Sequence, residues 1–341
     1  MAGAHRRLGG PGYALVERAR DTIARHGMIA RGDVVLAALS GGPDSTALVD
    51  VLARLEGSLG LAVHIAHVDH GLAGDSAEVA SRLASAAAES GFEVHVVRAP
   101  DLAGPNLHAR AREFRYGFFH TVAGQIGAAR IATGHTLDDR AETTLARLVH
   151  GADTGGIAGI PPVDGARIRP LIEARRAETR AYCIESGLSF VDDPANDDPR
   201  FERAAIRNEI VPAITERFGA GAVASIARSA ERLGEDAAAL DGIADRLWPG
   251  LASEADSVAG GDEPAAIVRL PLDELRKLPR ALRRRMLEHA VGRVRDRAGG
   301  IEAVLEALEG GAKPGARFDV ADGIEITLTR EGIVVARRMP T

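Results

Sequence analysis

The chain has 341 residues, of which 45% are apolar and 26% are charged, and its formal net charge is −6. This balance is typical of a globular protein with one large and one smaller domain, and it excludes general disorder. No stretch approaches the roughly 18 to 20 apolar residues of a membrane span, and the N-terminus lacks the apolar core of a signal peptide, so no membrane partner is expected. A negative chain does not coat nucleic acid in bulk, although a local basic face can still bind phosphates.

From the N-terminus, helical patterns alternate with short β-rich apolar runs. Helices are predicted at 13–30, 46–57, 75–91, 106–127 and 138–149, and strands at 33–39, 61–68, 92–97 and 129–134. This alternation predicts right-handed crossovers and a parallel sheet that is covered on both faces. The fold class expected for residues 1–220 is therefore α/β with a doubly wound parallel sheet.

The texture changes past residue 220. Residues 221–248 place apolar side chains on one helical face, an acidic linker follows at 253–265, and residues 272–294 are helical and basic. Three short strands are predicted at 316–320, 324–329 and 333–338, with turns at Asp322-Gly323 and Glu331-Gly332. We expect a second, smaller domain at 221–341 that is mainly helical and ends in a short β-meander.

A single cysteine, Cys183, limits the classes of site. One thiol cannot form an internal disulfide, a Cys-x-x-Cys metal site or a cysteine-ligated iron–sulfur cluster. Cys183 lies in a helix-like stretch beside an apolar residue, which favours a buried, inert thiol. This cysteine usage fits a reducing, cytoplasmic setting.

Three polar motifs follow predicted strands. SGGPDS (40–45) follows the first strand, HVDHG (67–71) ends the second, and TGHTLDDRAE (133–142) follows the fourth. In doubly wound sheets, ligands bind beyond the carboxyl ends of the strands. We therefore expect the three motifs to converge on one site.

The first motif has the features of a phosphate-binding turn. Its two glycines let the backbone approach an anion, and the N-terminus of the following helix directs N–H groups at that anion. The motif lacks the Gly-Lys-Ser/Thr ending of the common nucleoside-triphosphatase loop, which disfavours a hydrolase acting at the γ-phosphate. Asp44 would repel phosphate unless a metal lies between them, so it is interpreted as a Mg²⁺ ligand. A glycine-rich turn with a helix cap is the alternative; the predicted contacts are Ser40, Gly41, Gly42, Pro43, Asp44 and Ser45.

So placed, this hexapeptide resembles the loop of the N-type ATP pyrophosphatases. Those enzymes cleave ATP between the α and β phosphates, adenylate a carbonyl oxygen and let a nucleophile displace AMP. Over roughly residues 30–340, further segments occur in the order and spacing of the tRNA(Ile)-lysidine synthetases: HVDHG, TGHTLDDRAET, GADTGGIAGI (151–160), RIRPLIEARRAE (167–178), DDPANDDPRFERAAIRNEIVP (192–212) and LPRALRRRMLEHA (278–290).

The resemblance implies a tRNA-modifying ligase that uses ATP and Mg²⁺. ATP would adenylate the oxygen on carbon 2 of the wobble cytidine in a tRNA(Ile) with a CAU anticodon. The ε-amine of free L-lysine would then attack that carbon and expel AMP, leaving lysidine. The sequence leaves a homodimer open.

Asp139 and Glu142 lie three residues apart, on one face of the helix that follows the fourth strand. The matching carboxylates of the family are assigned to lysine recognition, so the resemblance implies that this pair holds the ammonium groups of lysine. Asp139 is also a candidate acceptor for the proton of the attacking amine. The alternative is a solvated acidic helix start that the helix dipole favours.

Two arginines and three histidines complete the candidate site around the nucleotide. Arg112 and Arg115 share a helix face, and one of them is expected to reach the triphosphate as a catalytic cation. Either can instead be a surface arginine. His67, His70 and His135 are candidates for nucleotide contact, with structural hydrogen bonding as the alternative; no third ligand for a zinc site is evident beside His67 and His70.

Asp193, Asn196, Arg203 and Arg207 match a family pattern in which a turn precedes two arginines four residues apart. The family has asparagine directly after the first arginine, where this chain has Ala204. Both arginines are interpreted as contacts to tRNA or phosphate, with an exposed salt-bridged pair as the alternative.

Residues 276–297 form the one strongly basic block and are interpreted as sequence-independent support for the tRNA backbone, or alternatively as a solvated charged helix. Its cations are Arg276, Lys277, Arg280, Arg283, Arg284, Arg285, Arg293, Arg295 and Arg297. Two rival functions stay open. One is another enzyme with the same loop, such as a tRNA thiolase; the other is a non-catalytic nucleotide- or tRNA-binding module, against which Asp44 argues.

Overall fold

The computed structural model describes residues 7–69, 71, 78, 81, 85, 87–89, 91–100, 107–191, 202–254, 266–292, 300–311, 313–321 and 323–337. Contacts divide the chain into two compact units, Met1–Gly234 (unit 1) and Glu235–Thr341 (unit 2). This division falls inside one long helix, whereas the sequence pattern placed a boundary near residue 220. Most of the helix predicted at 75–91 lies outside the described residues, as do His70, Asp193 and Asn196.

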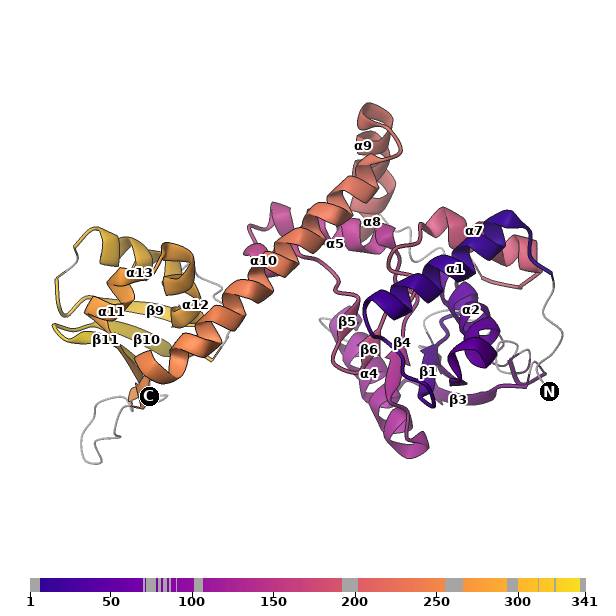
Figure 1. Ribbon diagram of the computed structural model, residues 1–341, viewed down its shortest axis with the longest axis horizontal. Coiled ribbons are helices and arrows are strands. Elements are labelled where there is room, and N and C mark those ends of the chain that lie inside the picture. The colour runs from indigo at the N-terminus through magenta and orange to yellow at the C-terminus, as the bar shows by residue number, and fades with distance from the viewer. Residues whose placement is uncertain are drawn as a thin grey trace. The chain divides into compact units, whose positions relative to one another are not determined.

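Unit 1 contains a six-stranded sheet with the order β3-β2-β1-β4-β6-β5 (Figure 1). The pairs β1–β2, β2–β3, β1–β4 and β4–β6 are parallel, and β5 is antiparallel to β6. The predicted doubly wound parallel sheet is confirmed, and the short β5–β6 hairpin is added at one end. The strands are β1 (Val34–Ala38), β2 (Ala62–Asp69), β3 (Glu93–Arg98), β4 (Arg130–Ala132), β5 (Val163–Asp164) and β6 (Arg167–Ile168).

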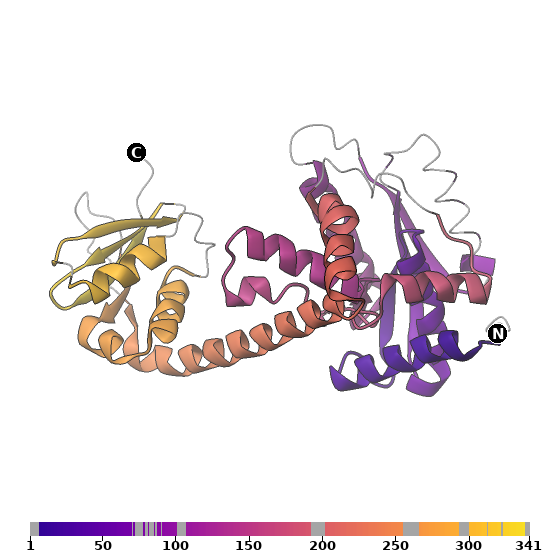
Figure 2. The same cartoon turned by 90° about the horizontal axis from the view of Figure 1, so that it is seen from above.

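Helices cover both faces of this sheet (Figure 2). Val35 packs in a core with α1, α2 and α7, whereas the next residue, Leu36, packs in a second core with α4. This alternation is the two-residue period of a strand buried on both sides. The helices are α1 (Gly10–Arg25), α2 (Pro43–Leu59), α4 (Leu107–Ile126) and α7 (Arg176–Ser186).

The remaining helices of unit 1 follow β4 or come after α7 in the chain. They are α5 (Leu137–Val149), α6 (Thr154–Ile157), α8 (Glu202–Ala205), the π-helical segment η2 (Ile206–Ile210), α9 (Val211–Phe218) and α10 (Ala222–Leu251), which continues into unit 2. The predicted apolar face of α10 is confirmed, since Val223, Ala230 and Ala237 are buried. Within the described ranges no single helix has the length and apolar character of a membrane span; only 202–218 joined with 222–251, across a bend of 105°, meets that test.

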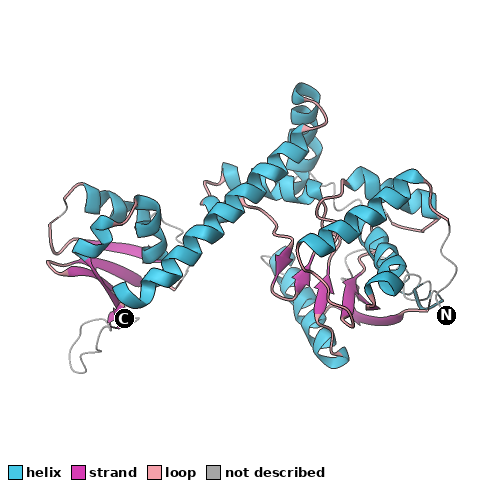
Figure 3. Cartoon of the chain, viewed as in Figure 1, coloured by secondary structure: helices cyan, strands magenta, loops and turns pink. Residues whose placement is uncertain are grey.

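Unit 2 combines helices with a five-stranded antiparallel sheet in the order β7-β8-β11-β10-β9 (Figure 3). The predicted meander is confirmed as β9–β10–β11, and β8 pairs with the free edge of β11. Gly332 permits this pairing, because a Cβ there would lie 2.3 Å from the carbonyl oxygen of Leu270. The elements are β7 (Ser253–Glu254), β8 (Ala266–Pro271), α11 (Leu272–Lys277), α12 (Arg280–Ala290), α13 (Gly300–Glu309), β9 (Arg317–Ala321), β10 (Ile324–Leu328) and β11 (Gly332–Arg337).

Candidate nucleotide site and its ion-pair network

The site of unit 1 lies where the strand order reverses. The chain proceeds outward from β1 through β2 to β3 and then returns to β4 on the other side of β1. The loops after β1 and β4 meet at this switch point: a Cβ on Gly134 would lie 2.9 Å from backbone atoms of Asp44 and Ser45. Only glycine allows this approach. Two of the three predicted motifs therefore share one rim, as doubly wound sheets require of a ligand site.

The loop after β1 has the backbone of an anion cradle. Gly41 has a φ of +92°, a region that favours glycine, and Gly42 caps α2 without a side-chain hydrogen bond. The hydroxyl of Ser45 donates to the carbonyl of Gly42 and accepts the N–H of Ser40, both at 3.0 Å. Ser45 thus folds the loop onto the helix, while the first-turn N–H groups of α2 have no side-chain cap and can hold phosphate oxygens.

Asp44 is positioned in the first turn of α2. Thr179 donates a hydrogen bond to its Oδ1, and the Nε of Arg176 lies 3.6 Å from its Oδ2. Burial raises the pKa of Asp44 to about 6, against the lowering effect of the Thr179 hydrogen bond. The surrounding groups therefore do not fully offset the cost of burying the charged carboxylate. A hard cation beside its oxygens would stabilise this charge. This donor set fits Mg²⁺.

The two described histidines of the prediction have structural partners. His67 is buried, and its Nδ1 donates to the carbonyl oxygen of Leu39 at 2.8 Å, directly before the loop. His135 shares a hydrogen bond of 2.9 Å with the hydroxyl of Thr133. Burial lowers the pKa of His135 to about 4, so it is neutral at pH 7. Both brace the loops, and a direct contact of either with nucleotide stays a prediction.

Asp139 and Glu142 lie on one face of α5, as their spacing predicts, but both carboxylates have arginine partners. Glu142 is 1% exposed and accepts hydrogen bonds from Arg176 at 2.8 Å, from Arg207 at 3.0 Å through both of its oxygens, and from Arg203 at 3.3 Å. The Oδ1 of Asp139 accepts from Arg176 at 3.0 Å and from Arg203 at 2.8 Å. The alternative of a solvated acidic helix start is wrong, since both groups are buried and paired.

Asp139 also caps the N-terminus of α5. Its Oδ2 accepts the N–H of Thr136 at 2.8 Å, and the two residues form a capping box at the start of α5. Burial alone would raise the pKa of Asp139, but the guanidinium groups of Arg176 and Arg203 lower it to about 2. A carboxylate of this pKa is a weak base, which argues against its predicted part as proton acceptor.

Arg176 joins the loop to the carboxylate pair and was not singled out from the sequence. It contacts Asp44, Asp139 and Glu142 at 3.6, 3.0 and 2.8 Å. The preceding residue sets its position. Arg175 donates two hydrogen bonds to the carboxylate of Asp138, and the same carboxylate accepts the backbone N–H of Arg176. The sequence signal was present as two consecutive arginines at a helix start within the segment 167–178.

Arg112 and Arg115 lie on α4 and both pack on Tyr116, with guanidinium-to-ring distances of 4.9 and 5.6 Å. Arg112 is exposed, whereas burial lowers the pKa of Arg115. Arg112 is also one of the cations that lower the pKa of His135. Its charge therefore acts at the rim of the site.

Arg203 and Arg207 come from α8 and η2, and their side chains are 45% and 24% exposed. The two arginines reach inward to Glu142, so an exposed salt-bridged pair is not what forms. Ala204 between them is buried, 4% exposed. Its methyl group has no hydrogen-bond donor or acceptor, so this position makes no side-chain hydrogen bond.

The described cations of the basic block in unit 2 are largely neutralised by acids. Arg280 and Arg284 pair with Glu302, Arg283 with Glu309, and Arg285 with Asp241. Residues 293–297 lie outside the described ranges. The described arginines of α12 are thus in part-exposed ion pairs, and the support of a tRNA backbone by this block stays a prediction.

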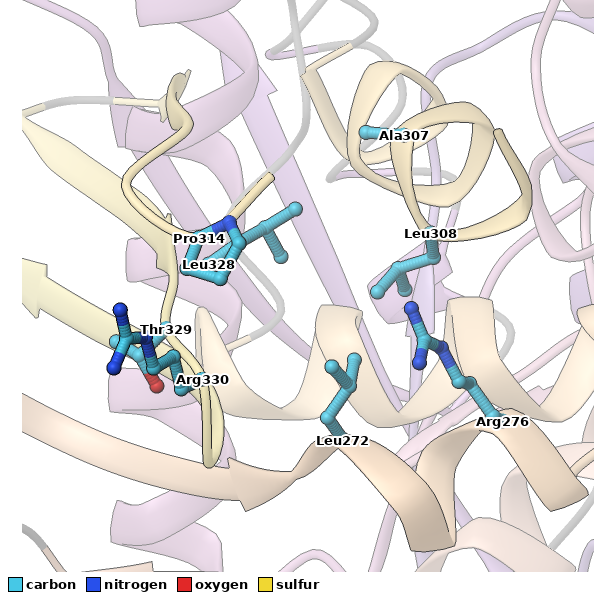
Figure 4. A pocket seen from close by; sticks show the side chains of 8 residues that line it. All are labelled: Leu272, Arg276, Ala307, Leu308, Pro314, Leu328, Thr329 and Arg330. Carbon is cyan, nitrogen blue, oxygen red and sulfur yellow. The ribbon is translucent and has the colours of Figure 1, made fainter. Parts of the chain in front are cut away.

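Arg276 differs from these arginines, because it lines a recess of about 260 Å³ between α11, α13 and the turn before β11 (Figure 4). Arg330 lies across the recess, and within the described part of the chain neither guanidinium has an ion-pair partner. Apolar side chains, among them Leu272 and Leu308, form the rest of the lining. The recess belongs to unit 2, whereas the loop after β1 belongs to unit 1.

Comparisons with known proteins agree with this fold. A family model described as a PP-loop domain matches residues 16–214. The chain is 39% identical to the tRNA(Ile)-lysidine synthase of Symbiobacterium thermophilum, over 96% of this chain and 70% of that relative. It is 39% identical to the enzyme of the same name from Leifsonia xyli subsp. xyli, over 79% of each chain, and 33% identical to that of Geobacter sulfurreducens, over 96% and 70%.

Among solved structures, the chain is similar to the U34-tRNA thiolase NcsA from Methanococcus maripaludis, with a TM-score of 0.56 and 19% identity, over 65% of this chain and 78% of that one. At this identity the likeness shows the shared fold and nothing finer.

Proposed function

Because the chain belongs to the tRNA(Ile)-lysidine synthase family of PP-loop enzymes, and is thus a tRNA-modifying ligase with an ATP-binding domain, we propose that it joins free L-lysine to carbon 2 of the wobble cytidine of tRNA(Ile) with a CAU anticodon. ATP with Mg²⁺ would supply the adenylate that activates that carbon. We place the reaction in the cytoplasm, where the tRNA substrate is available and a free thiol such as Cys183 stays reduced.

One observation carries the proposal: Arg176 contacts both the loop that would hold pyrophosphate and the carboxylates that would hold an amine. A ligase of this kind must present an activated carbon and an amine side by side, because proximity supplies much of the rate. A guanidinium shared by Asp44, Asp139 and Glu142 keeps the two half-sites within one side chain's reach.

The nucleotide half-site would use the loop from Ser40 to Ser45. The N–H groups at the start of α2 would hold the β and γ phosphates, and Asp44 would bind Mg²⁺. Of the two candidate arginines we assign the triphosphate contact to Arg112, because it is exposed and its charge reaches His135. Neutral His135 would then add no repulsion or attraction of its own to the phosphates.

The amine half-site would work by exchange of cations. Asp139 and Glu142 are balanced by arginines in this state, so the ammonium groups of lysine must replace one of them. Arg203 is the partner that can leave most readily, since it is 45% exposed whereas Arg176 is 27% and Arg207 is 24% exposed. The released Arg203 would then contact phosphate or tRNA, as its sequence pattern predicts. Asp139 would hold the ammonium rather than take its proton.

The tRNA would contact unit 2 as well as unit 1. Arg276 and Arg330 are the cations of unit 2 best placed to meet phosphate, since the arginines of α12 are already paired. A thiolase reaction is disfavoured for this chain, because burial raises the pKa of the Cys183 thiol to about 12 and its sulfur donates to the carbonyl of Pro43.

The proposal is tested by incubating the purified protein with ATP, Mg²⁺, radiolabelled lysine and transcripts of tRNA(Ile) with a CAU anticodon. We expect label to enter the tRNA in an ATP-dependent manner, and none to enter a transcript in which the wobble cytidine is replaced by uridine. ATP binding without lysine transfer would reject the substrate assignment while leaving the PP-loop function intact. A non-catalytic module would show no turnover at all.

A further inference from the structure

A cluster of three potential metal ligands lies at one edge of the sheet of unit 1, on β2 and the edge strand β3. His64 on β2 pairs in register with Glu93 on β3, and His95 is two residues farther along β3. Side chains two residues apart on a strand project from the same face. The pairing of β2 with β3 therefore brings one carboxylate and two imidazoles together on one surface.

The distances within this cluster match those of a coordination sphere. The Nδ1 of His64 lies 3.3 Å from the Oε2 of Glu93 and 3.4 Å from the Nε2 of His95. One ligand atom from each of the three residues lies within 4.8 Å of the other two. In a tetrahedral zinc site with bonds of about 2.0 to 2.1 Å, neighbouring ligand atoms are separated by about 3.3 Å. The rings of His64 and His95 are stacked with centroids 5.7 Å apart, so a cation held by all three residues needs these rings to turn toward it and Glu93 to close on it.

The cluster is distinct from the nucleotide site. His64 lies near the start of β2, whereas the rim is at Asp69, about 16 Å farther along the strand. Its donors also differ from those of Asp44, because two imidazoles and one carboxylate suit zinc and related transition metals, whereas Mg²⁺ prefers oxygen ligands alone. The side chain of Glu93 is 75% exposed and that of His64 is 19% exposed, so an ion and a water ligand can reach the cluster.

We propose that His64, Glu93 and His95 bind one divalent transition-metal ion of the zinc class, with a fourth position open to solvent. The ion would cross-link β2 to β3, which is the terminal strand of the described sheet. Such a cross-link would stabilise the pairing of an edge strand, which otherwise depends on one neighbour.

The test uses untagged, chelator-stripped protein in a buffer with saturating Mg²⁺, and it measures Zn²⁺ binding by calorimetry. We expect one ion per chain, and in the presence of Co²⁺ the visible absorption of a tetrahedral cobalt site. Zinc at about 100 times its dissociation constant should raise the Tm of unit 1 by about 5 to 10 °C. His95→Gln should weaken zinc binding at least tenfold and abolish the cobalt spectrum.

Two further variants keep the result interpretable. Glu93→Gln changes an exposed side chain and tests the site if His64→Gln fails to fold. His150→Gln is the matched control, because His150 pairs with Glu202 at 2.6 Å but, among the described residues, belongs to no group of three donors; it should bind zinc like the wild type. The proposal is overturned if the wild type binds no zinc under these conditions, or if His95→Gln and Glu93→Gln bind it as tightly as the wild type. In that case the cluster is a cross-strand hydrogen bond between imidazoles with an exposed carboxylate beside it.

Discussion

Replacement of Glu142 by glutamine removes the charge on which the ion-pair network depends. The wild-type carboxylate is 1% exposed and is bonded by Arg176, Arg203 and Arg207. Removing one partner from a buried ion pair costs about 3 to 5 kcal/mol, because the other charge is left without compensation. The three arginines are a quarter to almost half exposed, so water takes over part of that compensation. We therefore expect Glu142→Gln to lower the free energy of unfolding by about 2 to 3 kcal/mol.

Urea unfolding of the wild type and the variant, followed by circular dichroism, measures this change. Glu202→Gln serves as the control, because its ion pair with His150 is exposed on both sides and should change stability by less than about 0.5 kcal/mol. A second substitution, Arg207→Gln in the Glu142→Gln background, should recover part of the loss, since it removes a charge whose remaining acid is Asp139 at 3.8 Å, which Arg176 and Arg203 already share. If Glu142→Gln unfolds like the wild type, the network does not hold the site together and the reasoning is refuted.

Three further changes probe other parts of the site. Gly134→Ala should destabilise unit 1 by about 1 to 3 kcal/mol and weaken ATP binding, because its methyl group would lie 2.9 Å from the backbone of Asp44; unchanged equilibrium binding of ATP would contradict this close approach. Because the pKa of His135 is about 4 in the folded chain and 6.5 as a free group, the unfolded chain takes up this proton first, so the contribution of His135 to stability should fall by on the order of 3 kcal/mol as the pH drops from 6.5 to 4. Asp44, whose pKa burial raises to about 6, contributes in the opposite direction over the same window. The stability of His135→Gln should therefore fall less, or rise more, than that of the wild type across this window, and an equal pH dependence of the two would place the titrating group elsewhere. Arg203→Gln should lower the KM for lysine by about two- to fivefold with no change in the KM for ATP, because it removes a competitor from an exposed pair; steady-state kinetics that show a raised KM for lysine would reject cation exchange.

Much of the fold of unit 1 is legible in the sequence, because its strands are apolar runs bounded by glycine or polar turns. The pattern does not reveal β5 and β6, since each has two residues and exists only through pairing. The same holds for β8, whose place is determined by the distant strand β11 and by the glycine that lets the two backbones approach.

The site could be predicted where its residues are close in sequence, and not where they come from distant segments. The loop from Ser40 to Ser45 can be recognised because glycines, a helix start and an aspartate occur within six positions. The partners of Glu142 could not be recognised, since they lie 34, 61 and 65 positions away on other helices. Sequence spacing indicates which carboxylates share a face, but tertiary packing decides which cations meet them.

The measurement that tests the account most directly follows the fate of ATP labelled at the α or the γ phosphate, in the presence of lysine and tRNA. The wild type should release AMP and pyrophosphate, and Asp44→Ala should release neither. Formation of ADP and inorganic phosphate, or undiminished release of pyrophosphate by Asp44→Ala, would contradict the assignment of this loop and its aspartate.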